Sequence, residues 1–334
     1  MNAARRLTTL ALLLLSAPVS TLAANQAQLI EIRSSPCIAC DAMSQQLRGD
    51  PRWAALSARI SVRTLDRDQA EAADLLKQHP VGRLPSWLLL NADGEEMGRV
   101  AGAVSADAFH ARISQLLAQR TTLKARRYRT TDTTAEGAAA TAEALESFHA
   151  QGLGDAGFAW WMRLPLAVRG QHTGTVAVQR WRNRIEFLQA AQRGQPMESD
   201  IGGQKVLADP ALGCDRGLEL DRYVASTIGL PAETRRNHLQ AQLPAMQAEL
   251  ARGWFSEAPA CVDGASLLLA TADLYAALDD APAERALLKR AAADTERRLA
   301  GKPLSSDPAL AGLQTALQDR LNQLDTESHP GAAR

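Results

Sequence analysis

The sequence is poor in aromatic residues, in cysteine and in net charge. Aromatic side chains make up 4% of its 334 residues, and there are only 4 cysteines, which excludes a disulfide-rich miniprotein. The 37 basic and 37 acidic side chains balance. No global field therefore attracts a phosphate backbone, and we expect no binding to nucleic acid. The 46% hydrophobic content is enough for a folded core, and the length is typical of two domains.

The first 24 residues have the features of a secretory signal peptide. Arg5 and Arg6 provide the positive start, residues 7–15 are apolar, and small residues around Ala23 offer a cleavage site. A membrane anchor is the alternative, but the apolar run is short and ends in small residues. We therefore expect residues 1–24 to be removed. The mature protein would then be periplasmic or otherwise secreted, would not span the membrane, and would lie where disulfides persist.

The following segment, predicted as a first domain over residues 25–120, alternates between short apolar runs and helical stretches. Asp93-Gly94 lies between two of the apolar runs, which is a strong signal for a β-hairpin. A parallel strand pair joined by a helix and extended by such a hairpin gives a mixed sheet with helices on both faces. The expected order is strand 29–33, helix 37–47, strand 60–65, helix 68–78, strands 87–90 and 97–101, and a helix capped by Ser105.

After residue 120 the strand patterns largely disappear. Residues 121–134 are polar and charged and are predicted as a linker, and residues 135–328 as an all-α domain. Apolar residues between 178 and 188 follow a helical stripe, so the three arginines between them are predicted to form a solvated helix face. Residues 265–299 resemble one hairpin of a tetratricopeptide array, although one unit does not establish an array. The arginines are Arg180, Arg182 and Arg184.

Cys37 and Cys40 form a Cys-x-x-Cys pair at the start of a predicted helix. Such a pair serves either metal binding or redox chemistry. A structural zinc would need two more soft ligands at compatible spacing, and the other cysteines lie far along the chain, so we expect no metal. The helix N-terminus favours a thiolate on Cys37, which makes it the nucleophile. Cys40, one turn later, can resolve the mixed disulfide. Electrons then travel as dithiols, and no cofactor is expected.

Glu31 is the acid in the apolar strand that precedes this pair. A buried carboxylate at this place can take the proton of Cys40 when that thiol becomes a nucleophile, so Glu31 is the predicted proton shuttle. The alternative is a strand residue that faces solvent, and alternation alone does not decide between the two. Asp41 directly follows Cys40, and a nearby carboxylate disfavours a thiolate, which argues against a strongly oxidising pair.

These features, in this order, resemble the thioredoxin superfamily over residues 28–120. Leu84-Pro85 before a strand is similar to the cis-proline loop of that family, and Gly102 to the glycine before its last helix. The resemblance implies that Leu84 and Pro85 lie opposite the cysteines and hold a partner's backbone, and that Gly102 lets the partner approach. An ordinary proline at the start of a strand is the alternative for Pro85.

Cys214 and Cys261 form an even pair in the second half of the chain. In an oxidising compartment the default is a structural disulfide between helices, and a redox relay with Cys37 and Cys40 is the alternative. The sequence as a whole predicts an α/β thioredoxin-like domain followed by an all-α domain. It indicates an extracytoplasmic thiol–disulfide oxidoreductase that acts on protein thiols and disulfides.

An upstream redox partner, such as a membrane reductase, would supply such an enzyme with electrons. The alternative function is a protein-binding or assembly module, in which the helical domain holds a partner and the first domain is scaffold.

Overall fold

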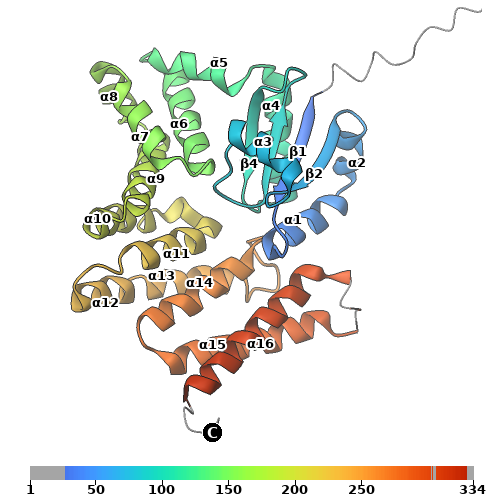
Figure 1. Ribbon diagram of the computed structural model, residues 1–334, viewed down its shortest axis with the longest axis vertical. Helices are drawn as coiled ribbons and strands as arrows, with labels where there is room; N and C mark the ends of the chain where they lie inside the picture. Colours follow the sequence, from blue (N-terminus) through green and yellow to red (C-terminus); the bar gives the residue numbers. More distant parts are fainter. Residues whose placement is uncertain (1–26, 302, 304–305, 329–334) are drawn as a thin grey trace, which may run out of the picture.

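The computed structural model describes residues 27–301, 303 and 306–328, so the predicted signal peptide lies outside the described residues. A four-stranded sheet has the order β2-β1-β3-β4 (Figure 1). β1 pairs parallel with β2 and antiparallel with β3, and β3 pairs antiparallel with β4. The sheet is therefore mixed, as predicted. Its strands are β1 (Gln28–Arg33), β2 (Ser61–Asp66), β3 (Ser86–Leu90) and β4 (Glu96–Ala101).

Helices cover both faces of this sheet. Alternate strand residues such as Leu29 and Leu89 pack against α1, α2 and α4, whereas Ile30 and Leu88 pack against α3 and the loop after it. The period of two along each strand places these sets on opposite faces. The helices are α1 (Ile38–Arg48), α2 (Pro51–Ser57), α3 (Ala70–Gln78) and α4 (Ala106–Gln119).

Local sequence explains where these helices begin and end. Cys37 is the N-cap of α1, and Gly49 is its C-cap. Asp50 then caps α2 and Pro51 opens it, a position that needs no backbone N–H. The Gly-Asp-Pro sequence thus ends one helix and starts another that the apolar pattern did not predict. Ser105 caps α4 by accepting a hydrogen bond from the backbone N–H of Ala108.

The segment predicted as a linker is folded. It contains α5 (Leu123–Arg127) and the short 3-10 helix η3 (Tyr128–Thr131). The buried Arg126 donates to the Met97 carbonyl oxygen at 2.6 Å and pairs with Glu143 at 2.6 Å. The segment therefore packs against both β4 and the next helix.

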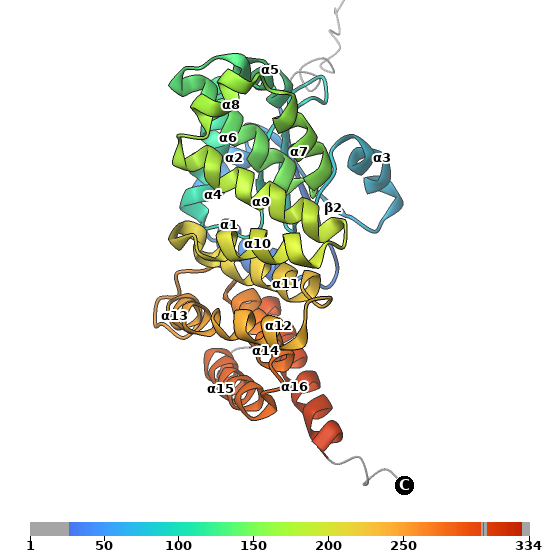
Figure 2. The same ribbon diagram turned by 90° about the vertical axis from the view of Figure 1, so that its left-hand side faces the viewer.

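The remaining chain is a series of helices. These helices and α5 are together called the helical half. It passes beside the first domain and then below it (Figure 1), and its helices follow one another towards the C-terminal end of the molecule (Figure 2). No helix among the described residues is long and apolar enough to cross a membrane. Its further elements are α6 (Ala135–Ala150), α7 (Gly154–Arg163), α8 (Leu166–His172), α9 (Val176–Gln192), α10 (Pro196–Leu207), η4 (Pro210–Asp215), α11 (Arg216–Ser226), α12 (Ala232–Gln240), α13 (Leu243–Gly253), α14 (Gly264–Ala277), α15 (Ala281–Leu299) and α16 (Pro308–Ser328).

The predicted stripe on α9 is buried, but the predicted solvated arginine face is wrong in part. Val178 and Ile185 are fully enclosed. Arg184 is also buried, with 4% of its surface exposed, and pairs with Asp215 at 3.0 Å. Its guanidinium group lies over the Trp181 ring, 4.5 Å from the ring centre. The helical half packs on both sides of α9, so no face of this helix is wholly exposed.

Two further contacts hold the helical half against the first domain. The Gly82 N–H donates to the Ala150 carbonyl oxygen at 3.0 Å, and a Cβ on Gly82 would lie 2.4 Å from the backbone nitrogen of Gly152. α16 lies against α1, where Gly312 faces Ile38. The first contact needs glycine because two backbones touch there.

Candidate active site

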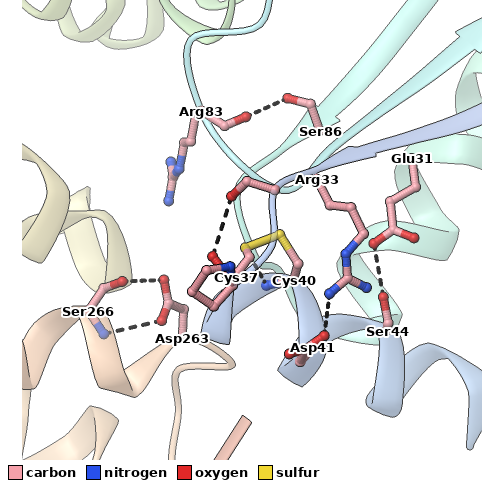
Figure 3. The surroundings of a disulfide bond; sticks show 12 residues. Glu31, Arg33, Cys37, Cys40, Asp41, Ser44, Arg83, Ser86, Asp263 and Ser266 are labelled. Atoms are coloured by element: carbon pink, nitrogen blue, oxygen red, sulfur yellow. Dashed lines mark hydrogen bonds and ion pairs between the residues drawn. A yellow bond between two sulfur atoms is a disulfide. The ribbon is translucent and has the colours of Figure 1, made fainter. Parts of the chain in front are cut away.

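Cys37 and Cys40 are joined by a disulfide at the N-terminus of α1 (Figure 3). The Cys37 sulfur accepts a hydrogen bond from the Cys40 backbone N–H at 3.1 Å, so it takes the place of an N-cap oxygen. Cys37 is half-buried, whereas Cys40 is fully enclosed. A partner can therefore reach the Cys37 sulfur more readily, and the free N–H groups of the helix end favour a thiolate there.

Glu31 faces the helix that carries the cysteines and does not face solvent. Only 4% of its surface is exposed. Its carboxylate accepts hydrogen bonds from the Ser44 hydroxyl at 2.9 Å and from the Thr64 hydroxyl at 3.1 Å. Ser44 lies one helical turn beyond Cys40. Figure 3 shows Glu31 and Ser44 on the same side of the disulfide. The structure thus places a buried carboxylate against α1, bonded one helical turn beyond the enclosed cysteine.

The carboxylate of Asp41 is neutralised by a partner from β1. Asp41 lies in the first turn of α1 and forms an ion pair with Arg33 at the end of that strand (Figure 3). From the sequence, Asp41 is expected to be an unpaired charge beside the cysteines. The Arg33 guanidinium offsets its field, so Asp41 opposes a thiolate on Cys37 less than an unpaired carboxylate would.

Leu84-Pro85 is a cis peptide bond, as is Ser35-Pro36 directly before Cys37. The Gly102 N–H donates to the Pro85 carbonyl oxygen at 2.8 Å, which joins the two loops. Gly102 has a φ of +80°, a conformation that favours glycine. The end of β4 and the turn before β3 therefore form one surface.

The space in front of Gly102 is filled from within the chain. A Cβ on Gly102 would lie 2.2 Å from Nε of Arg83. The guanidinium of Arg83 then reaches Asp215 at the end of η4, at 2.7 Å. The resemblance implied that Gly102 leaves room for a partner, but in this structure the Arg83 side chain occupies that room.

Asp215 is shared by two arginines at the contact between the halves. Burial alone would raise the pKa of Asp215, but the charge of Arg83 and then that of Arg184 hold it below its usual value. Arg83 and Asp215 were not candidate residues, because no local pattern relates two residues so far apart in sequence. The pair can be recognised only from the contact of the two side chains in the structure.

The helical half brings a second set of residues close to the cysteines. Asp263 caps α14 through the Ser266 backbone N–H, and Figure 3 shows both residues on the side of the site opposite Glu31. Cys214 and Cys261 are joined by a disulfide, and Asp215 and Asp263 follow them by one and two residues in the sequence. Among residues 27–301, 303 and 306–328, no group of three His, Cys, Asp or Glu side chains is placed to hold a metal ion.

Comparison with known proteins agrees with this geometry. Residues 17–117 match the family model of a thioredoxin-like domain. The first domain belongs to the thioredoxin superfamily. The predicted fold class, a thioredoxin-like domain followed by a helical region, is confirmed. A search of curated proteins and a search of solved structures found no match to the chain.

Proposed function

We propose that the protein is an extracytoplasmic thiol–disulfide oxidoreductase that exchanges disulfides with protein partners. The observation that carries the proposal is the pairing of an accessible Cys37 with an enclosed Cys40 at the N-terminus of α1, in a thioredoxin-like domain. A helix end of this kind lowers the pKa of a cysteine and makes it a nucleophile and a good leaving group.

The reductive direction proceeds in two steps. The Cys37 thiolate attacks one sulfur of the partner's disulfide, which gives a mixed disulfide and releases the partner's other sulfur as a thiolate that takes up a proton. Cys40 loses its proton to Glu31 and attacks Cys37. The Cys37–Cys40 disulfide forms and the partner leaves as a dithiol, so two electrons have passed to the partner. The oxidative direction uses the same residues in reverse order.

The cis-proline loop and the glycine turn would bind the partner. Gly102 and Pro85 are joined by a hydrogen bond, and with Leu84 they would form the binding surface. The Arg83 side chain has to move from Gly102 before a partner backbone can lie there. A second redox partner, such as a membrane reductase, would restore the dithiol. The predicted signal peptide and the disulfide of the helical half support a location in the periplasm or outside the cell.

Reduction of insulin disulfides by the full chain tests this function. With a dithiol donor present, the wild-type chain is expected to precipitate insulin far faster than the donor alone, and the Cys37→Ser chain is expected to match the donor alone. Equal rates for the two chains would refute catalysis by Cys37 and favour the alternative of a binding module with a scaffold domain.

A further inference from the structure

The Cys214–Cys261 disulfide lies where the helical half meets the redox site. Asp215 follows Cys214 and pairs at 2.7 Å with Arg83, which directly precedes the cis-proline loop. On the other side, Val262 follows Cys261 and packs against the core of the thioredoxin-like domain. Both cysteines are therefore attached, through their next residue, to the domain that carries Cys37 and Cys40.

A cavity lies between Cys261 and the first turns of α1. Its volume is about 250 Å³, and Ile38 and Ala42 of α1 line it together with Cys261 and Asp263. Ile38 lies between the two redox cysteines in the sequence, and Figure 3 shows Asp263 on the side of the site opposite Glu31, bonded to Ser266. Cys261 and the first turn of α1 thus border the same space.

The two sulfurs of this disulfide are unequally accessible. Cys261 is buried, with 5% of its surface exposed, whereas Cys214 is half-buried. Gly213, directly before Cys214, has a φ of +54° and interrupts the helical geometry of η4. A Cβ on Gly213 would have no atom within 4 Å, so the space beside this backbone is open. The second pair therefore repeats the asymmetry of Cys37 and Cys40, with one accessible and one enclosed sulfur.

We propose that Cys214 and Cys261 are a second redox-active pair that exchanges electrons with Cys37 and Cys40 within the chain. This inference rests on the proposed function. When both pairs are reduced by an external dithiol protein, they hold four electrons. Cys37 and Cys40 transfer two of these electrons to a partner disulfide, and the second pair then reduces Cys37 and Cys40 again.

The internal exchange takes two steps. The Cys214 thiolate attacks the Cys37 sulfur, the Cys37–Cys40 bond breaks, and Cys40 leaves as a thiolate that takes up a proton. The Cys261 thiolate then attacks Cys214 and releases Cys37 as a thiolate. A Cys214–Cys261 disulfide and a Cys37–Cys40 dithiol result. The relay requires that the Cys214–Cys261 disulfide is the more stable of the two in the folded chain, so that the Cys37–Cys40 dithiol is regenerated.

Counting turnovers of the fully reduced chain tests the relay. The chain is reduced, freed from the reductant, and mixed with an excess of a small protein disulfide. The wild-type chain is expected to reduce two disulfides per molecule, and the C214A/C261A chain one, since each Cys pair carries two electrons. The C37S/C40S chain, which keeps the second pair, is expected to reduce none in the same time.

Each other result has a definite meaning. One disulfide per molecule for both the wild type and C214A/C261A would refute the relay and leave the proposed function standing. None for the wild type would refute the proposed function itself. One for C37S/C40S would show that the second pair reacts directly with partners, which also refutes the relay.

A measurement on the unmutated chain tests the relay even if the variants fail to fold. The reduced wild-type chain is treated with one equivalent of glutathione disulfide, quenched with acid and alkylated over time. The relay predicts that the bridge is found first between Cys37 and Cys40 and later between Cys214 and Cys261, with a transient Cys37–Cys214 peptide in the monomer. A bridge that stays on Cys37–Cys40 would overturn the relay.

Discussion

Replacing both Cys214 and Cys261 by alanine removes a bridge between residues that are 47 positions apart. In the chain-entropy model, closing a loop of this length lowers the entropy of the unfolded chain enough to stabilise the folded chain by about 4 kcal/mol. The same model gives about 1.5 kcal/mol for Cys37–Cys40, whose separation is 3. The contributions of the two disulfides to the free energy of unfolding are thus expected to differ by more than twofold.

Urea unfolding of the oxidised chains measures this difference. The C214A/C261A chain is expected to lose about 4 kcal/mol of unfolding free energy relative to the wild type, and the matched C37A/C40A chain about 1.5 kcal/mol. Trp254, which is buried in the same core as Cys261, provides a fluorescence signal for the helical half. A loss below about 1 kcal/mol for C214A/C261A, or an equal loss for both chains, would refute the entropic account of the longer loop.

Three further perturbations test the site and the contact between the halves. Glu31→Gln is expected to slow the release of the mixed disulfide by about 100-fold at neutral pH, because the proton acceptor for the enclosed cysteine is lost, while alkylation of Cys37 keeps its rate. Asp215→Asn is expected to destabilise the chain fully above about pH 4 and progressively less below it. A carboxylate with a lowered pKa contributes its full stability above its unfolded pKa and loses it as the pH falls through the folded one. Gly82→Ala is expected to lower the unfolding free energy by about 1–3 kcal/mol, since its Cβ would meet backbone, whereas Gly170→Ala on an exposed helix surface is neutral or stabilising.

Each of these expectations has a contradicting result. An unchanged release rate in Glu31→Gln would exclude that residue as the proton acceptor. A stability difference between wild type and Asp215→Asn that is as large at pH 3 as at pH 6 would show that the charge of Asp215 is not what matters. Equal effects of Gly82→Ala and Gly170→Ala in urea unfolding would show that the backbone contact at Gly82 does not limit the packing of the halves.

The first domain could be predicted because its signals are local. Asp93-Gly94 marked the hairpin between β3 and β4, Ser105 marked the start of α4, and the apolar periods separated strands from helices. The spacing of Cys37 and Cys40 likewise follows from one helical turn. These features need no knowledge of distant residues.

The rest depends on packing between distant segments. Arg184 could not be placed, because a charged residue on a helix is normally solvated unless a partner such as Asp215 meets it from another element. Residues 121–134 have a polar composition, yet Arg126 is buried because it finds both a carbonyl and a carboxylate. The Arg83–Asp215 pair, which connects the cis-proline loop to the helical half, has no sequence signature at all.

The central claim is that Cys37 attacks partner disulfides and Cys40 releases them. Incubating the full-length Cys40→Ser chain with an oxidised protein partner, followed by mass spectrometry of the non-reduced peptides, tests this claim most directly. We expect a stable mixed disulfide on Cys37 that is absent from the Cys37→Ser chain and that a dithiol reagent removes. A Cys40→Ser chain whose Cys37 stays a free thiol in the presence of the partner would contradict it.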